Sequence, residues 1–600
     1  MHASAYNYFQ NNEAARLARL LGEDSTPYQR EALLLDRGMR TELWLEERGW
    51  FAEAKDWLGL QRVHPSAALW TFYHTMDSGV PTPREAWLMT RQVDTEIPHL
   101  PVRGPGVPAG LYTLAESNWM PYDWSINNVV MGEAVHAALG FWQAGRADEA
   151  WRIAKGSLLA AMFMGISPGN VGSMSYLDVY RRESQRDFAD GSGVLSRALV
   201  EGLFGVRPDA LGGELHFEPG WPADWDHAAL RHPDVAVSFR RSGEADAYVV
   251  EQRFSKPQAL RLRLMARRDQ VGGVTVDGAA APWHVIENSV GAPRIDVLAP
   301  AGARHEIVVR WAGAAIRAGR SDKFARVEQG QMRWWAAPGA IPAAASFADA
   351  RGRRPATRPQ GKFEPVDLTA NFNDRVTQIF KNEYRAPRSP FVSLALPKQG
   401  LGGWAGGVNA TAEIDDRGLR AVAAKNGGKI VLPTGEPLAT PGAADAKNVL
   451  FVSRWDNYPR EATVPLAGKA SRAALLMAGS TNPMQSRMDN GEVVVAYTDG
   501  TSARLALANP ETWWPIEQDY FIDDFQFRDD AALPIRVDLK TGDMRVLEHE
   551  SFKGRGGKIS GGAATVLELA LDPRKELKSL TVRALANDVV IGLMAATLVR

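Results

Sequence analysis

The chain changes its hydrophobic period near Gly205, and this change constrains the fold more than any other feature of the sequence. Before Gly205, apolar residues recur at the three- and four-residue spacing of amphipathic helices, as in residues 127–144. After it, apolar and polar residues alternate with the period of two that is typical of half-buried strands, as in residues 235–239. We therefore expect a helical region followed by β domains.

The helical region is expected to contain about seven helices. The helix-like segments are residues 14–21, 32–50, 65–76, 83–97, 127–144, 147–165 and 193–205. Thr82 directly before Pro83 is a good N-cap and first-turn pair. Several connections are long, and long loops in a compact helical domain usually carry function.

Two groups of strand-like segments follow. The first group is residues 235–239, 248–254, 260–264, 274–276 and 306–311, and the second is 449–453, 473–477, 492–497, 503–507, 565–571 and 580–582. Thr498-Asp499-Gly500 between two segments of the second group predicts a tight hairpin. The predicted fold class is multidomain α+β. Its predicted domains are 1–205 helical, 206–315 a small antiparallel β domain, 316–365 a linker rich in Ala, Pro, Gly and Arg, and 366–600 a β-sandwich or jelly roll.

Charge and composition exclude several classes of partner. The 69 basic and 70 acidic residues leave a net charge of −1, so a long-range attraction to nucleic acid is not expected. The chain has no cysteine, which excludes disulfides and thiolate metal sites. The longest apolar run, residues 158–166, is far shorter than the roughly 20 residues of a membrane span. No basic segment followed by an apolar one opens the chain, so no signal peptide is expected.

Two loops of the helical region combine acids, amides and indoles. The first is residues 114–124 and the second is residues 186–193. Such side chains are costly to bury and poor at building a core, so a cleft that binds sugar explains them better than packing does. The expected partner is an oligosaccharide or polysaccharide.

Glu116 and Asp190 are the candidate catalytic carboxylates, because glycoside hydrolysis needs one protonated and one ionised carboxyl group across the scissile bond. Glu116 lies among Tyr112, Trp119 and Trp124, and this apolar setting disfavours the ionised form, as a general acid requires. Asp190 precedes Gly191-Ser192-Gly193 and a helix, whose N-terminus would stabilise a carboxylate base. In the alternative interpretation, each residue caps the helix that follows it.

Further residues of these loops are candidates for substrate binding. They are Asn118, Trp119, Asp123, Trp124, Asn127, His64, Asp178, Arg181, Glu183 and Asp187. Asp123 is also placed to cap a helix, His64 forms a second group with Asp56 and Trp57, and residues 178–187 could be only an ion-paired loop. The histidines lack metal-ligand spacing, and no phosphate-binding loop follows a strand, so neither a metal nor a cofactor is expected.

The end of the helical region resembles the six-hairpin, (α/α)6-toroid glycosidases. The residues concerned are Asp190-Gly191-Ser192-Gly193, the segment 197–209, Gly213-Glu214-Leu215 and the segment 218–225. The resemblance extends loosely to family 95 of glycoside hydrolases, in which Glu116 would match the acid and Asp190 the base machinery. Ala115 and Ser192 depart from that family's pattern. The whole chain is more similar to the bacterial group called domain of unknown function 4450, through segments 56–61, 122–128 and 476–487.

This resemblance implies an incomplete toroid, with about seven of twelve helices, and a glycosidase that acts on plant-type or bacterial polysaccharide, by an inverting displacement. We expect the chain to be a fragment or to have a late start site. The resemblance implies a periplasmic or extracellular location, and it leaves the sugar and the oligomeric state open. Two alternatives stay open. One is a polysaccharide lyase that uses Tyr176, Tyr180 and Arg181, and the other is a non-catalytic protein that holds glycan on Trp513 and Trp514.

Overall fold

The structure is a computed structural model in which the chain divides into two compact units. The described residues are 1–56, 59–118, 129–163, 176–178, 183–185, 190–316, 323–328, 331–336, 361–382, 412–455, 457–481, 485–519, 533–547 and 557–600. The first unit comprises Met1–Glu53, Ala67–Ser117 and Asn128–Ala340, and the second comprises Ala54–Ser66, Asn118–Asn127 and Ile341–Arg600. Each unit is described by itself.

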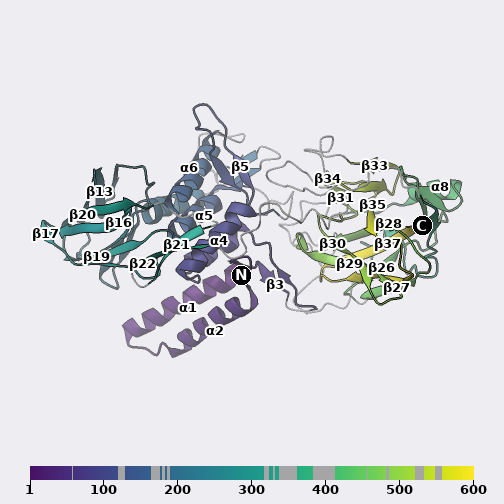
Figure 1. Ribbon diagram of the computed structural model, residues 1–600, viewed down its shortest axis with the longest axis horizontal. Coiled ribbons are helices and arrows are strands. Elements are labelled where there is room, and N and C mark those ends of the chain that lie inside the picture. Colours follow the sequence, from purple (N-terminus) through teal and green to yellow (C-terminus); the bar gives the residue numbers. More distant parts are fainter. Residues whose placement is uncertain are drawn as a thin grey trace. The chain divides into compact units, whose positions relative to one another are not determined.

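The first unit begins with helices (Figure 1). They are α1 (His2–Leu21), α2 (Thr26–Glu42), α3 (Leu69–Asp77), α4 (Pro83–Thr95), α5 (Met131–Gln143), α6 (Ala147–Phe163), α7 (Asp190–Arg197) and the π-helical turn η1 (Ala198–Leu203). Helix α1 packs on α2 and α5 on α6, while α3 packs on α1, α4 and α5, and α5 also packs on α7 and η1. Short connections make α1–α2 and α5–α6 helical hairpins.

Helix boundaries follow local signals where such signals exist. Helix α4 begins with the predicted pair, since the Thr82 hydroxyl accepts a hydrogen bond from the Glu85 amide and the Glu85 carboxylate accepts one from the Thr82 amide. Helix α1 begins twelve residues earlier than predicted, at His2 rather than residue 14. Helix α2 ends at Glu42 and not near residue 50, because residues 44–45 and 50–51 pair as a hairpin that turns at Gly49, with a φ of 78°.

Short strands connect the helices of the first unit. They are β1 (Trp44–Leu45) with β2 (Trp50–Phe51), β5 (His99–Pro101) with β6 (Tyr112–Leu114), and β7 (Val129–Val130) with β8 (Tyr176–Asp178) and β9 (Glu183–Gln185). Strand β7 leads directly into α5. The strands β3 (Ala54–Lys55) and β4 (Val63–His64) belong to the second unit.

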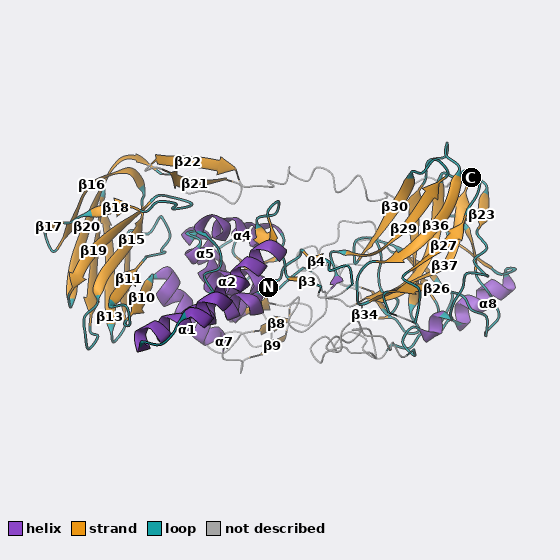
Figure 2. Ribbon diagram, turned by 90° about the horizontal axis from the view of Figure 1, so that it is seen from below, coloured by secondary structure: helices purple, strands orange, loops and turns teal. Residues whose placement is uncertain are grey.

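Two sheets follow the helices in the first unit (Figure 2). One contains β10 (Val206–Asp209), β11 (Glu214–Phe217), β15 (Ala259–Met265), β19 (Arg294–Ala301) and β18 (Trp283–Val285); the other contains β12 (His227–Arg231), β13 (Val235–Ser242), β14 (Ala245–Gln252), β20 (Arg304–Ala315), β16 (Arg268–Val276) and β17 (Ala279–Ala280). All five strand-like segments of the first predicted group are strands. Strands β11 and β15 pair in parallel, so this region is not purely antiparallel as expected.

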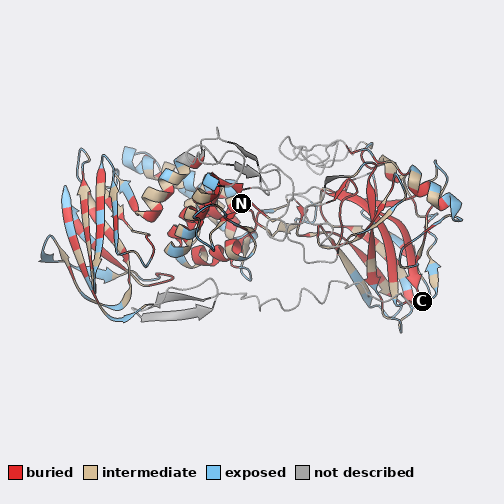
Figure 3. Cartoon of the chain, turned by 90° about the horizontal axis from the view of Figure 1, so that it is seen from above, coloured by how far each residue is buried: buried red, intermediate tan, exposed pale blue. Residues whose placement is uncertain are grey.

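The two sheets share an apolar core. Burial alternates along β14 and β15, as the banded strands in Figure 3 show, and Phe217 of β11 meets Tyr248 of β14 with ring centroids 6.1 Å apart. The Trp142 indole of α5 donates to the Gly220 carbonyl at 2.7 Å, which joins the helices to this region. The hairpin of β21 (Lys323–Glu328) and β22 (Gln331–Ala336) lies within the segment interpreted as a linker.

The second unit is built on two antiparallel sheets. The larger contains β23 (Phe363–Pro365), β37 (Val589–Val599), β28 (Arg472–Thr481), β35 (Ala563–Ala570), β32 (Ile535–Asp538) and β33 (Met544–Val546), with β26 (Leu450–Ser453) also paired to β37; the smaller contains β27 (Glu461–Pro465), β36 (Leu577–Ala584), β29 (Asp489–Tyr497) and β30 (Ser502–Ala508). The remaining elements are η2 (Val376–Gln378), α8 (Arg417–Lys425), β24 (Lys429–Val431), β25 (Pro437–Ala439), β31 (Gln518–Asp519) and β34 (Gly557–Lys558). The predicted hairpin at residues 498–500 joins β29 to β30, with Gly500 at a φ of 86°.

Strand β37 lies between two apolar cores of the second unit. All of its residues are buried. Val589, Ile591 and Leu593 belong to the core that both sheets share, whereas Val590 and Met594 belong to a second core around α8. A strand buried on both faces is expected to read as a continuous apolar run, and residues 589–599 do.

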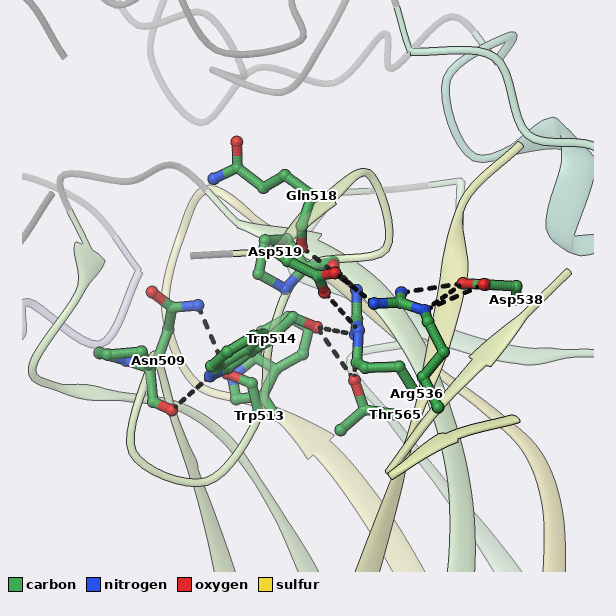
Figure 4. Close-up of polar contacts among 11 residues, drawn as sticks. Asn509, Trp513, Trp514, Gln518, Asp519, Arg536, Asp538 and Thr565 are labelled. Carbon is green, nitrogen blue, oxygen red and sulfur yellow. Dashed lines mark hydrogen bonds and ion pairs between the residues drawn. The ribbon is translucent and has the colours of Figure 1, made fainter. Parts of the chain in front are cut away.

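A buried arginine organises one end of this unit (Figure 4). The Arg536 side chain is fully buried on β32, and its guanidinium donates to the Asp519 carboxylate at 3.0 Å and to the Pro515 and Gln518 carbonyls at 2.7 and 3.2 Å. Arg545 binds the other oxygen of Asp519 at 2.7 Å. Arg536 therefore holds the segment 514–519 against the larger sheet.

The paired indoles of this segment are core residues. Trp513 and Trp514 are each 1% exposed, and Trp513 lies in the core between the sheets. The hypothesis that their rings hold glycan at the surface is therefore wrong. The aromatic and acidic residues after position 510 reflect packing around Arg536.

Among the described residues, no helix combines the length and the apolar character needed to cross a membrane.

Replacing Arg536 with methionine is expected to lower the free energy of unfolding by about 3–5 kcal/mol, because Asp519 and two carbonyls would lose their buried partner. Urea denaturation followed by circular dichroism measures the change. Arg574→Gln is the control, since the Arg574 side chain is 86% exposed and its loss should stay within about 0.5 kcal/mol. Equal effects of the two substitutions would contradict this account.

Candidate active site

One carboxylate joins three helices of the first unit. Asp77, the last residue of α3, accepts hydrogen bonds from the Arg197 guanidinium of α7 at 2.6 and 2.7 Å and from the Gln143 amide of α5 at 3.3 Å. Nε2 of His136 on α5 lies 3.4 Å from the same carboxylate. Burial opposes ionisation of Asp77, but the nearby His136 and the hydrogen-bonded Arg197 guanidinium outweigh it and hold the pKa of Asp77 well below its usual value.

The contacts among these helices show that they run in the same direction. At the N-terminal ends, Val129 directly before α5 packs with Ala115, whose neighbour Glu116 binds the Leu69 amide of α3. At the C-terminal ends, Asp77 of α3 meets Gln143 of α5. The Trp142 ring near the end of α5 fills the space beside Gly202 of η1, and α5 also contacts α7, which precedes η1. Helices α5 and α7 are therefore parallel. The first residues of α3, α5 and α7 (Leu69, Met131 and Asp190) therefore lie at one end of this helical layer.

Glu116 lies at this end of the layer. Its backbone carbonyl accepts a hydrogen bond from the Leu69 amide at 2.7 Å, two residues after β6 ends. Its side chain is fully buried, and its neighbour Ala115 belongs to an apolar cluster with Leu100 and Val129. The helix that contacts the Glu116 backbone is thus α3.

Glu53 occupies the N-terminus of α3, which the sequence did not predict. Its carboxylate accepts hydrogen bonds from the Ala68 amide at 3.0 Å, the Thr71 hydroxyl at 2.6 Å and the Trp70 indole at 2.8 Å. Helix α3 begins at Leu69 after Ala68, which has no side chain that could cap it. Glu53 supplies that cap from a loop, so no local sequence signal could have revealed it.

Further acidic residues lie at the same end. Glu133 is in the first turn of α5, and among the described residues nothing hydrogen bonds to its buried Oε2 atom. Asp178 pairs in register with Glu183 in the three-stranded sheet that begins with β7. Asp190 is the first residue of α7, which therefore begins three residues before the predicted start at Gly193. The helical layer therefore brings Asp178, Glu183 and Asp190 to the end that holds Glu116.

The other predicted site residues are not part of this group. Trp119, Asp123, Trp124, Asn127, Arg181 and Asp187 lie outside the described residues. His64 and Asn118 belong to the second unit. There, Nε2 of His64 lies 2.8 Å from Asp56, the partner with which the sequence grouped it, and the Asn118 carbonyl accepts a hydrogen bond from Arg487 at 3.2 Å.

A cluster of aromatic and imidazole rings joins helices α1, α3 and α5. His74 of α3 lies near Tyr6 of α1 and His136 of α5, with ring centroids 5.1 and 5.8 Å apart. Burial lowers the pKa of His74 to about 4, and the neighbouring His136 and His2 add to this effect. His74 is therefore neutral near pH 7 and offers a hydrogen-bonding group without charge. No local pattern in the sequence could have indicated it, because the ring cluster joins three separate helices.

No family model matches the chain, and no curated protein matches it. Solved structures that it resembles in part are glycoside hydrolases. A GH63 mannosylglycerate hydrolase from Thermus thermophilus is 21% identical over 33% of this chain and 44% of that one, with a TM-score of 0.24. A Streptomyces avermitilis alpha-L-rhamnosidase is 12% identical over 51% of this chain and 26% of that one, with a TM-score of 0.32.

A GH127 beta-L-arabinofuranosidase from Geobacillus stearothermophilus is 11% identical over 45% of each chain, with a TM-score of 0.20. This chain thus spans less than half the length of these structures. Such low TM-scores and partial coverage leave the function to be inferred from the carboxylates themselves.

Asp77→Asn is expected to lower the free energy of unfolding by about 1.5–3 kcal/mol at pH 7, because the charged hydrogen bonds to Arg197 weaken. The pKa of Asp77 is lowered in the folded chain, so its contribution is complete above the unfolded value of about 3.9 and is lost as the pH falls below it. Denaturant titrations at pH 7, 5, 4 and 3 should therefore show the two proteins converging in acid. Asp234→Asn, at a side chain 57% exposed, is the control. A difference that stays constant down to pH 3 would contradict the role of Asp77.

The imidazole of His74 is expected to titrate with a midpoint near pH 4. Because this pKa lies below the unfolded value of about 6.5, His74 favours folding above pH 6.5 and that contribution is lost as the pH falls from 6.5 to 4. Carbon–proton correlation spectra of histidine-labelled protein measure the midpoint, and His74→Gln identifies the signal. A midpoint above pH 6 would show that the ring is not enclosed as described.

Proposed function

We propose that this chain is a glycoside hydrolase that cleaves an oligosaccharide or polysaccharide with Glu116 and Asp190. The observation that carries the proposal is the parallel alignment of α3, α5 and α7. This alignment brings the start of α3, where Glu116 is bound, and the start of α7, where Asp190 stands, to one end of the helical layer.

The helical arrangement supports a six-hairpin type of fold. In the first unit, alternate helices α1, α3, α5 and α7 pack in succession, while α2, α4 and α6 pack on α1, α3 and α5. An inner ring of parallel helices with an outer ring of return helices is the (α/α)6 toroid that the sequence resembles. In the second unit, two antiparallel sheets around one core support the predicted β-sandwich.

The surroundings of the two carboxylates suit different protonation states. The Glu116 side chain is fully buried, and exclusion of water favours the protonated form of a carboxyl group. Asp190 stands at a helix N-terminus, where free amide groups favour an anion. Glu116 would protonate the leaving glycosidic oxygen while Asp190 removes a proton from the attacking water.

An inverting displacement needs room for that water. The two carboxyl groups of an inverting enzyme are about 6.5–9.5 Å apart, compared with about 5–5.5 Å in a retaining enzyme. Water from the face opposite the leaving group then attacks the anomeric carbon, and the product has inverted configuration. Asp178 and Glu183, on the sheet that precedes α5, would bind sugar hydroxyls beside the reacting bond.

Glu116→Gln and Asp190→Asn are each expected to lower kcat by about 10²–10⁴-fold, because each removes one proton transfer from the transition state. The assay screens glycans and aryl glycosides with the unmodified chain, then compares initial rates of the variants on the best substrate. Glu244→Gln is the matched control, since the Glu244 side chain is 62% exposed on a turn of the β region.

Both variants should keep the circular dichroism spectrum and unfolding midpoint of the parent chain. Near-normal turnover by either of them would remove that residue from the mechanism. The turnover of Glu133→Gln should be measured in the same assay, because Glu133 is a further carboxylate at the N-terminal end of α5. A product that absorbs ultraviolet light would instead indicate elimination by a lyase.

A further inference from the structure

Charged side chains cover one face of the five-stranded sheet in the first unit. On β15, Arg261 and Arg263 alternate with the buried residues Leu260, Leu262 and Leu264. Since successive side chains of a strand point to opposite faces, the two arginines lie on the face away from the core that the two sheets share. On the neighbouring strand β19, Arg294 lies opposite Met265 and Asp296 lies opposite Arg263.

Nearly all cations on this face are paired with carboxylates. Arg261 binds Glu214 at 3.1 Å and Asp296 at 2.9 Å. Glu218 accepts from Arg294 at 2.5 Å and from Arg207 at 3.1 Å.

Arg263 is the exception. Among the residues that the structure describes, no carboxylate lies within 4.0 Å of its guanidinium, and its Nε atom is closed off from solvent without an acceptor. The carboxylate opposite it in register, Asp296, is engaged by Arg261 and lies 3.4 Å from His284.

Arg263 and Arg294 form part of the wall of a cavity of about 250 Å³. The rest of the wall comes from the ends of α3 and α5, the start of α4 and the loop before β19, and includes Met76, Pro81, Pro83, Ala86, Gln143 and Ile286. The cavity is smaller than the 300–1,000 Å³ of sites for drug-sized ligands. It therefore suits a molecule of the size of one sugar ring or less.

Removing a guanidinium partly from water without a counter-ion lowers the stability of the folded chain. Buried polar groups without a partner commonly mark the place of a bound molecule. A carboxylate is the complementary group, because it accepts two parallel hydrogen bonds from the guanidinium fork. The prolines, Met76 and Ile286 offer apolar surface to the carbon skeleton of such a ligand. The Ser289 hydroxyl donates to the Ile286 carbonyl, so its oxygen can accept a hydrogen bond from a ligand hydroxyl.

We propose that this cavity binds a small hydroxylated carboxylate, of the sugar-acid or hydroxy-acid class, with its carboxylate on Arg263. The site is separate from the candidate active site. Met76 and Gln143 lie at the C-terminal ends of α3 and α5, whereas Glu116 and Asp190 lie at the N-terminal ends of α3 and α7. Binding here does not depend on the proposed hydrolase activity.

Isothermal titration calorimetry with D-glucuronate tests the proposal, with D-glucose as the neutral compound of the same ring. D-glucuronate should bind and D-glucose should not. Arg263→Gln should weaken D-glucuronate binding about 10–100-fold, because it removes a hydrogen-bonded charge. Arg304→Gln, at a side chain 54% exposed on β20, is the matched control and should bind like the parent chain.

Ala86→Leu narrows the cavity without changing charge, and it should also abolish binding. Glu116→Gln should leave binding intact, which distinguishes this cavity from the candidate active site. Unfolding midpoints confirm that each variant is folded. Equal binding of D-glucose, undiminished binding by Arg263→Gln, loss of binding in Glu116→Gln, or no binding of D-glucuronate by the parent chain would each overturn the proposal. An equal response to acetate and sulfate would also overturn it, since the site would then bind any anion.

Discussion

The first unit depends on the carboxylate of Asp77. This residue ends α3 and binds Arg197 of α7 and Gln143 of α5, so it ties three helices together at one level. A mostly buried, ionised carboxylate is stable only with such partners. The same contacts hold the C-terminal ends of α3, α5 and α7 at one level. The N-terminal ends of α3, α5 and α7 therefore lie at the same end of the helical layer.

The N-terminal ends of α3, α5 and α7 differ in their polar contacts from the C-terminal ends, where Asp77 lies. At the end where α3 begins, the Glu53 carboxylate accepts hydrogen bonds from the Ala68 amide and from the Thr71 and Trp70 side chains, and the Glu116 side chain is buried. At the C-terminal ends of α3 and α5, Asp77 pairs with Arg197. Arg263, which has no carboxylate partner among the described residues, lines a cavity there. The paired polar groups around Asp77 hold the helical layer together.

Local sequence signals predicted the local structure well. The Thr82–Glu85 capping box, the turn at residues 498–500 and the alternating strands on both sides of it form as expected, because each depends on neighbours in the chain. Long-range partners could not be predicted. Glu53 caps α3 from a loop. Arg536 holds segment 514–519 against the larger sheet, so the burial of Trp513 could not be predicted from its neighbours in the sequence. For the candidate site, a helix near Asp190 was predictable, although it begins at Asp190 and not after the glycines, at Gly193. The parallel alignment that relates it to Glu116 arises only from tertiary contacts.

The separation between the carboxyl carbons of Glu116 and Asp190, measured in a crystal of the chain, tests the central claim most directly. Two carboxylates that act on one glycosidic bond should lie about 5–10 Å apart, with no protein group filling the space between them. A separation above about 15 Å, or an Asp190 carboxylate held only by an arginine outside that space, would contradict the account.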